Sequence, residues 1–230
     1  MYWQVPKIWK DETCFILGGG SSLLSQFEVP EDLISEVKSK STKLGSLRHY
    51  FSPLEAKHVI AVNMSYRLGN FVDILFFGDT SYYRRNRIQI LRDFKGLKVT
   101  CMNNINYIKD GVKYLVRDKD CKQLGISEKP AAVRWGYNSG AAAINLAYHL
   151  GVKRIVLLGF DMCLGDNNNQ HWHGLYAKRN IKTIQSVFDR HKQAFPAIAK
   201  DAERLGIEIL NCSPISTITE FKKVSLKDVL

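Results

Sequence analysis

Six short apolar runs, each followed by glycine, asparagine, aspartate or serine, constrain the fold of this chain more than any other feature. Apolar residues are nearly continuous within each run rather than alternating, which is typical of parallel strands that are covered on both faces. We therefore expect parallel strands over residues 14–17, 58–62, 73–77, 98–102, 154–158 and 208–210.

Helical patterns alternate with these runs. Residues 139–150 are rich in alanine and end at Gly151, and residues 177–205 carry apolar side chains three and four positions apart up to Gly206. Pro196 should kink or restart the second helix. Strands that alternate with helices predict an α/β fold, here a single Rossmann-like domain over residues 1–230 with a mainly parallel sheet and helices on both faces.

Two polar stretches fall outside this frame. Residues 37–53 are basic and rich in turn formers, and residues 162–175 contain an asparagine run and then His171-Trp172-His173. Long loops in compact domains often cover or form ligand sites. We expect residues 37–53 to be a lid-like loop insertion that is mobile without ligand, and residues 162–175 to be a second functional loop.

The composition excludes several classes of protein. Of the 230 residues, 45% are apolar and 24% charged, which excludes a mostly disordered chain. No apolar run approaches the length of a membrane span, and no signal peptide is visible at the N-terminus. No two of the five cysteines have the spacing of a zinc or redox pair, and Cys14, Cys101 and Cys212 lie in apolar runs. We expect these three to be small buried side chains in a reducing, cytoplasmic compartment.

The charge balance is strongly basic. Lysine and arginine number 33 against 22 acidic residues, which gives a net charge of +11, and the densest basic run is residues 84–87. Such a surplus suits an anionic substrate, an anionic membrane surface or nucleic acid, and charge alone does not choose among them.

Small and polar residues follow the expected strands. Ligands of open α/β sheets bind at the carboxyl ends of the strands, so we expect a site there that draws on Gly18, Gly19, Gly20, Ser21, Ser22, Asn63, Gly78, Asp79, Asp161 and Ser213. Consecutive glycines let backbone N–H groups approach an anion. The run lacks both the third glycine of the dinucleotide fingerprint and the lysine of a phosphate loop, so a nucleotide or sugar-phosphate site and a plain turn remain as alternatives.

A second motif opens the alanine-rich helix. Asn138, Ser139 and Gly140 stand at its start, where a side chain caps the helix and unpaired N–H groups can hold a phosphate or a base. The two roles are compatible.

The third motif is His171-Trp172-His173. Extended His-x-His places two imidazoles on one side of the chain, as a metal pair with nearby aspartates, as a general base with a helper, or as structural residues. We favour a general base, and His173 over His171, because Gly174 leaves space beside it for an acceptor.

Taken in order, these motifs resemble those of the small bacterial sialyltransferases that use CMP-sialic acid. The resemblance runs from about residue 12 to about residue 222 and is most specific over residues 138–161. The matching motifs are residues 18–23, 63, 76–79, 138–140, 150–155, 159–162, 171–174 and 212–214. A looser resemblance links the chain to the Rossmann-like proteins with a Gly-x-Gly-x-Ser-Leu motif, which include a pterin pyrophosphokinase.

The chain departs from the sialyltransferase pattern at three points. Gly19 stands where the family has asparagine, and Cys163 stands where it has a tyrosine that helps to hold the departing phosphate. No tyrosine lies between Asp161 and Trp172, and Tyr176 is the next along the chain.

The resemblance implies a glycosyltransferase without a metal or other cofactor. It would transfer a sugar from CMP-sialic acid or another nucleotide sugar to the hydroxyl of an acceptor glycan. The net charge of +11 also allows an anionic lipid-linked glycan or, as an alternative, DNA as the acceptor, and peripheral contact with an anionic membrane. His173, His171 and Asp161 would be catalytic, and the glycine loop, Asn63, Gly78, Asp79 and residues 138–140 would hold the donor. The alternatives are a phosphotransferase or pyrophosphokinase that uses Mg²⁺ on Asp79, Asp161 or Asp166, and a nucleotide-binding module without catalysis.

Overall fold

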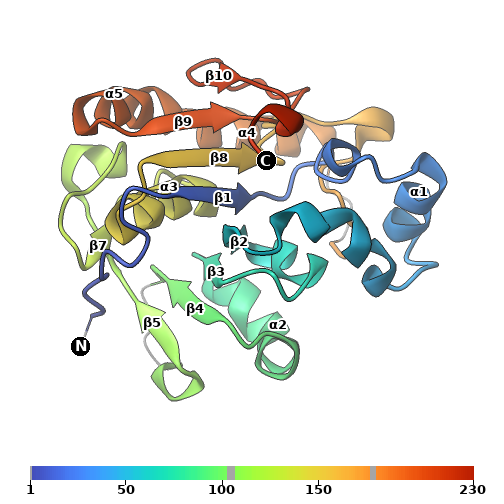
Figure 1. Ribbon diagram of the computed structural model, residues 1–230, viewed down its shortest axis with the longest axis horizontal. Coiled ribbons are helices and arrows are strands. Elements are labelled where there is room, and N and C mark those ends of the chain that lie inside the picture. The colour runs from blue at the N-terminus through green and yellow to red at the C-terminus, as the bar shows by residue number, and fades with distance from the viewer. Residues whose placement is uncertain (1, 103–106, 177–179) are drawn as a thin grey trace.

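The computed structural model describes residues 2–102, 107–176 and 180–230 and confirms the α/β fold (Figure 1). An eight-stranded parallel sheet has the order β10-β9-β8-β1-β2-β3-β4-β5. Its strands are β1 (Thr13–Leu17), β2 (His58–Val62), β3 (Ile74–Phe77), β4 (Leu97–Thr100), β5 (Val112–Tyr114), β8 (Arg154–Leu158), β9 (Glu208–Asn211) and β10 (Lys222–Lys223). A separate pair joins β6 (Val116–Arg117) to β7 (Ala132–Val133).

Strand order reverses at β1. The chain passes outward from β1 through β2, β3, β4 and β5, then crosses back to place β8 on the other side of β1 and continues through β9 to β10. Connections leave β1 and β8 in opposite directions, and a crevice opens between their carboxyl ends. The sheet therefore locates the site at the ends of these two strands.

Helices cover both faces of the sheet. They are α1 (Glu31–Ser39), α2 (Thr80–Asp93), α3 (Ser139–Leu150), α4 (Ile181–Lys192) and α5 (Phe195–Leu205). Short 3-10 helices span Ser25–Phe27, Leu44–Leu54, Asn63–Leu68, Ile108–Asp110, Asp120–Gln123, Asp166–Asn168 and Leu226–Asp228. The expected restart near Pro196 is confirmed. Helix α4 ends at Lys192, α5 begins at Phe195, and Pro196 lies in the first turn of α5.

The central strands β1, β2, β3 and β8 contribute side chains to two separate cores. On β1, Cys14 and Ile16 point to a core shared with α3 and α5, while Phe15 and Leu17 point to one that includes side chains of α1 and α2. Residues on a strand alternate between faces, so a strand buried on both sides must be apolar throughout. Burial on both faces of the sheet therefore explains why the apolar runs of the sequence are continuous.

Residues 37–53 differ from the expected loop. Val37–Ser39 complete α1, and Leu44–Leu54 form a 3-10 helix whose Leu47, Phe51 and Leu54 are wholly buried. These three side chains repeat every three or four positions, so the polar residues between them, Arg48, His49 and Ser52, hid an apolar face. The prediction that this segment lacks packing of its own is wrong. The second expected loop, residues 162–175, contains one short helical turn, Asp166–Asn168.

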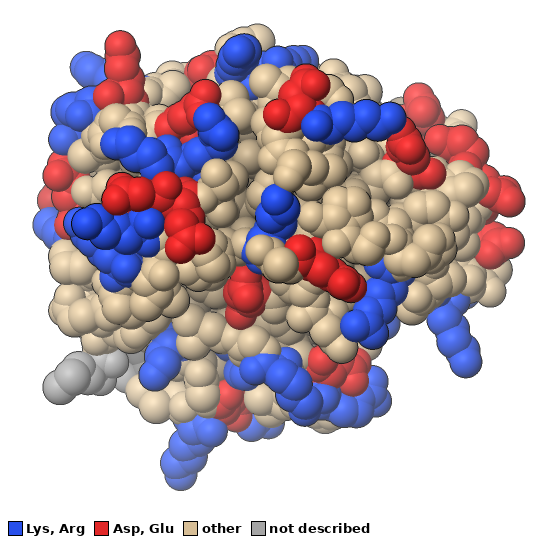
Figure 2. Space-filling model, viewed as in Figure 1, with Lys and Arg blue, Asp and Glu red and all other residues tan. Residues whose placement is uncertain are grey.

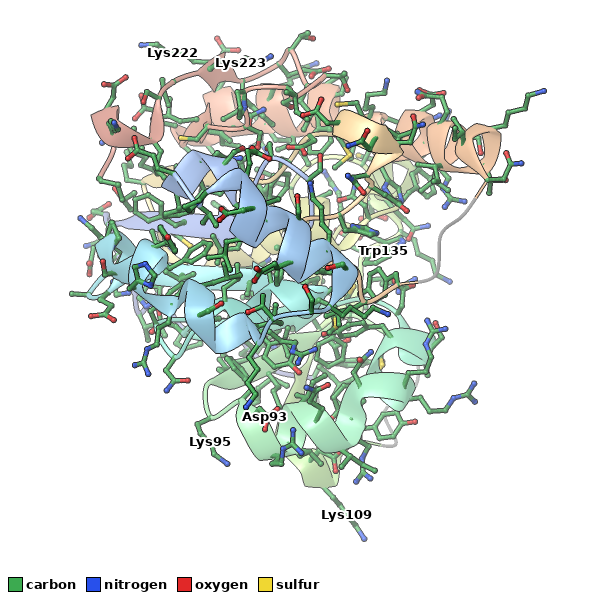
Figure 3. All side chains as sticks on the ribbon, turned by 90° about the vertical axis from the view of Figure 1, so that its right-hand side faces the viewer. Asp93, Lys95, Lys109, Trp135, Lys222 and Lys223 are labelled. Atoms are coloured by element: carbon green, nitrogen blue, oxygen red, sulfur yellow. The ribbon has the colours of Figure 1, made fainter. Side chains whose placement is uncertain are left out.

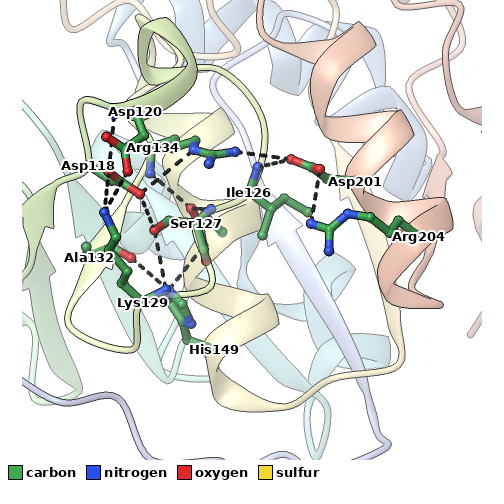
Figure 4. Close-up of polar contacts among 11 residues, drawn as sticks. Asp118, Asp120, Ile126, Ser127, Lys129, Ala132, Arg134, His149, Asp201 and Arg204 are labelled. Carbon is green, nitrogen blue, oxygen red and sulfur yellow. Dashed lines mark hydrogen bonds and ion pairs between the residues drawn. The ribbon is translucent and has the colours of Figure 1, made fainter.

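A polar network lies behind α3, away from the strand ends (Figure 4). Asp118 accepts hydrogen bonds from Ser127 and Lys129, and the buried amide oxygen of Asn145 accepts from the backbone N–H groups of Ser127 and Arg134. The carboxylate of Asp201 on α5 pairs with Arg134 at 3.3 Å. These bonds fasten the segment before α3 to two helices.

The surface mixes charges of both signs. In Figure 2, lysine and arginine alternate with aspartate and glutamate over the face shown, and acidic groups gather at the right-hand edge, where Figure 1 shows α1. Within the described residues, no helix has both the length and the apolar content that crossing a bilayer requires. Cys14, Cys101 and Cys212 are buried, as expected from the sequence.

Candidate functional site

A cavity of about 150 Å³ opens at the strand ends, where strand order reverses. The ends of β1, β2 and β8, the start of α3 and the histidine loop (residues 170–176) form its walls. It brings together most of the expected site residues: Gly18, Gly19, Gly20, Asn63, Asn138, Ser139, Gly140, Asp161, His171 and His173. Residues as far apart in sequence as Gly18 and His191 thus share one cavity.

A larger hollow of about 490 Å³ adjoins this cavity. Asn63, Ser139 and His171 line both spaces, so they form the boundary between the two. Asp79 and Trp135 line the hollow but not the cavity. Trp135 is labelled in Figure 3. Gly78 lines neither space; a side chain there would collide with the ring of Trp135.

The glycine loop, residues 18–22, is fixed by Asp161. The carboxylate of Asp161 accepts hydrogen bonds from the Ser22 N–H (2.9 Å), the Ser22 hydroxyl (2.5 Å) and the Ser21 hydroxyl (3.2 Å). Asp161 is 1% exposed, and burial raises the pKa of its carboxyl above the usual value. A Cβ on Gly20 would lie 2.5 Å from the Asp161 carboxyl carbon, so this position requires glycine.

Gly19 is the glycine that faces the cavity. A Cβ there would meet only the ring of His171, with Nδ1 at 3.3 Å, and no backbone within 4 Å. Gly19→Val should therefore fold and place two methyl groups in the cavity. We expect nucleotide affinity to fall by about tenfold or more, which corresponds to roughly 1.4 kcal/mol.

Gly45 offers a matched control for that variant. It is exposed, and a Cβ there would meet nothing within 4 Å, so Gly45→Val should bind nucleotide like the original chain. Titration calorimetry on both variants measures the affinity. Equal affinity in a folded Gly19→Val protein would contradict a role of the glycine loop in binding.

Polar groups of β2 and α3 face the cavity from the other side. The Asn63 backbone has a φ of 53°, and its buried Oδ1 has no hydrogen-bond partner within the described residues. Asn138 caps α3 by accepting the Ala141 N–H at 2.7 Å, as the sequence predicted. Ser139 and Gly140 follow in the first turn, whose N–H groups have no partner within a helix and favour an anion.

Trp172 ties the histidine loop to the glycine loop. Its ring is wholly buried, and its indole N–H donates to the Ser65 hydroxyl at 3.1 Å. Ser65 in turn donates to the Gly18 carbonyl at 2.6 Å, and the Trp172 backbone N–H reaches the Gly19 carbonyl at 3.3 Å. Hydrogen bonds therefore hold the histidine loop, the glycine loop and the segment that follows β2 together.

His171 and His173 lie on one side of the loop, as the His-x-His pattern predicted. Their rings stack at 5.3 Å with an angle of 12° between planes, and Tyr176 meets both edge-on. His171 Nδ1 donates to the Gly19 carbonyl at 3.1 Å, which leaves Nε2 as the nitrogen that carries the lone pair.

His173 has a different environment. It is 6% exposed, and its Nδ1 accepts the Leu175 N–H at 3.2 Å, so its lone pair is already engaged. Burial, followed by the influence of His171 and Arg67, lowers the pKa of His173 to about 3. This imidazole is neutral and a weak base.

The sequence analysis missed several residues that line the site or hold its loops in place. Ser65 and Trp172 were missed because their role is a bond between distant loops, which no local pattern shows. His191 on α4 lines both spaces, and burial lowers its pKa to about 4. Its place in the second helix could have been read from the helical spacing that put Phe188 on the inner face.

The acidic residues considered as metal ligands stay apart. Within the described ranges, Asp79, Asp161 and Asp166 belong to no group of three or more histidine, cysteine, aspartate or glutamate side chains that could hold a metal ion. Asp161 is occupied by Ser21 and Ser22, and Asp79 faces the larger hollow.

Comparison with known proteins gives similarity in structure alone. No protein-family model matches the sequence, and no curated protein matches it. The sialyltransferase CstII from Campylobacter jejuni, in complex with the substrate analogue CMP-3FNeuAc, is similar over 93% of this chain and 86% of its own, with a TM-score of 0.52 and 15% identity. CstII with a trisaccharide acceptor and CMP gives the same values. A MAf glycosyltransferase from Magnetospirillum magneticum AMB-1 is similar over 97% of this chain but 35% of its own, with a TM-score of 0.56 and 14% identity. The chain thus has the α/β fold of these sialyltransferase and glycosyltransferase structures.

Proposed function

We propose that this protein is a glycosyltransferase that takes a sugar from a nucleotide-sugar donor. The observation that carries the proposal is the meeting of the glycine loop, Asn63, the start of α3 and His171 around one cavity, at the point where strand order reverses. The shared fold with structures of transferases that bind CMP supports the same class.

The cavity would hold the donor. The glycine loop presents backbone to the ligand, and the first turn of α3 offsets the negative charge that develops on the departing phosphate. Asn63 Oδ1, buried without a partner in the described part of the chain, is suited to accept a hydroxyl or amino group of the nucleotide.

His171 is the better candidate for the general base. Its Nδ1–H is held by the Gly19 carbonyl, which directs the basic Nε2 elsewhere, and it lines both the cavity and the hollow. His173 supports it by stacking and by its own bond to Leu175. Asp161 acts through the glycine loop, which makes it a positioning residue.

A nucleotide panel tests the proposal. CMP, UMP, AMP and GMP are compared by thermal unfolding; a nucleotide at 100 times its dissociation constant should stabilise the protein by about 2.7 kcal/mol. Turnover of CMP-sialic acid and of other nucleotide sugars is then assayed with and without a chelator. No stabilisation by any nucleotide would overturn the proposal, and turnover that stops with the chelator would favour the magnesium-dependent phosphotransferase instead.

A further inference from the structure

We propose that the hollow of about 490 Å³ beside the donor cavity binds an acceptor saccharide that carries a carboxylate or phosphate group. This inference rests on the proposed function. It starts from His171, which separates the hollow from the glycine loop. A base must contact the acceptor hydroxyl, so the space on the far side of His171 from the glycine loop is the place for an acceptor.

Positive charge converges on this hollow from two helices. Arg85 on α2 and Arg190 on α4 both line it, and within the described residues neither forms an ion pair. By contrast, Arg87 on the same helix is neutralised by Asp110 at 2.6 Å. Two guanidinium groups that are not neutralised favour a carboxylate or phosphate.

The starts of two helices also face the hollow. Ser81 in the first turn of α2 and Ser139 in the first turn of α3 are among its lining residues. Each helix carries partial positive charge at this end. The arginines and the helix starts therefore act in the same direction.

Tyr82 supplies an independent sign of a ligand. Its side chain is 5% exposed and lines the hollow, yet its hydroxyl has no hydrogen-bond partner within the described residues. Burial raises its pKa well above the usual value, so the hydroxyl stays protonated and can donate. A buried hydroxyl without a partner costs stability, and an oxygen of a bound ligand would satisfy it.

The remaining walls suit a sugar ring. Trp135 and Tyr137 contribute aromatic surface from the segment that the network in Figure 4 holds against α3 and α5. Asp79 places a carboxylate in the same hollow, where it can accept sugar hydroxyls. The volume falls within the range of small-molecule sites, and aromatic faces with few polar groups are typical of them.

Arg84 and Arg85 give a matched pair for the test. Both are exposed and adjacent on α2, and Arg85 lines the hollow whereas Arg84 does not. Glucuronic acid and glucose serve as probes, because they differ in one carboxylate. Binding to the full chain is followed by NMR through the indole N–H of Trp135. We expect glucuronic acid to bind about tenfold more tightly than glucose, Arg85→Ala and Arg190→Ala to remove that preference, and Arg84→Ala to keep it.

Three results would overturn the inference. The first is equal binding of the two probes, and the second is the same loss in Arg84→Ala as in Arg85→Ala. The third is a loss in Arg85→Ala of affinity for CMP-sialic acid but not for CMP, because the anion held by Arg85 would then belong to the donor. Nucleotide stabilisation without any preference for glucuronic acid rejects this inference and keeps the proposed function; the preference without nucleotide stabilisation rejects the proposed function and leaves only an anionic-sugar site.

Discussion

Replacing His171 by alanine is expected to lower kcat by about 10²- to 10⁴-fold while changing nucleotide affinity by no more than a few fold. In the proposed mechanism His171 is the general base between the donor cavity and the acceptor hollow, and its bond to the Gly19 carbonyl fixes Nε2 as the basic nitrogen. The proposed nucleotide site should survive the change, because Asp161 still holds Ser21 and Ser22 and the Trp172 backbone N–H still holds the Gly19 carbonyl. Steady-state kinetics with the donor identified by the nucleotide panel measures kcat, and calorimetry measures affinity.

Controls separate the base from the other roles of the histidine loop. His49→Ala changes an exposed histidine outside both spaces and should leave kcat unchanged. His173→Ala should lower kcat less than His171→Ala, because the lone pair of His173 already accepts the Leu175 N–H. Full activity in a His171→Ala/His173→Ala double variant would exclude a catalytic role for either, and loss of activity that a chelator reproduces in the original chain would indicate a metal pair.

Acid should unfold this protein through histidines that are buried, as His149 and His173 are, or partly buried, as His191 is. Burial lowers the pKa of His173 to about 3 and that of His191 to about 4, and it also lowers the pKa of His149 behind α3. In the unfolded chain these imidazoles take up protons from about pH 6.5 downward, whereas in the folded chain the same imidazoles stay neutral at that pH. Stability is therefore fully present above pH 6.5 and is lost as the pH falls.

The expected loss is large. Between pH 7 and pH 5, His173 and His191 each remove about 2 kcal/mol from the free energy of unfolding, a total of about 4 kcal/mol out of the 5–15 kcal/mol that is usual for a domain. Asp161 has the opposite sign: burial raises its pKa, so the folded chain takes up this proton at a higher pH than the unfolded chain and gains stability from it as the pH falls. Urea unfolding at pH 7, 6 and 5 measures the dependence.

Single substitutions test which histidines cause that pH dependence of stability. His173→Gln and His191→Gln should each flatten the curve by about 2 kcal/mol between pH 7 and pH 5, whatever they do to stability at pH 7. His49→Gln, on the surface, should leave the curve unchanged. If both buried variants were as sensitive to acid as the original chain, the origin of the instability would lie elsewhere.

The sequence predicted the parts of this fold that burial dictates. Strands that lie between two apolar cores must be apolar throughout, so all six expected runs became strands of the sheet. The short β6, β7 and β10, of two residues each, left no such pattern. The 3-10 helix Leu44–Leu54 was missed because its buried side chains stand among polar ones.

The site, like the fold, could be predicted only in part. Residues at the ends of strands could be placed at one edge because parallel strands share a direction. Contacts between that edge and distant helices could not: Tyr82 and Arg190 reach the hollow from α2 and α4, and nothing in their local sequence indicates a common space. The bond between Trp172 and Ser65 is a similar case.

The two arginines of the hollow stand on the exposed surfaces of α2 and α4, outside both cores. Substitutions at such positions usually change stability by no more than about 0.5 kcal/mol. Gly18 and Gly20 of the glycine loop, by contrast, tolerate little change, because a Cβ at either would lie within 2.5 Å of Gly159 or Asp161. On the proposed function, mutations in the hollow would change the acceptor preference at little cost in folding stability, so that preference is free to evolve faster than the donor chemistry.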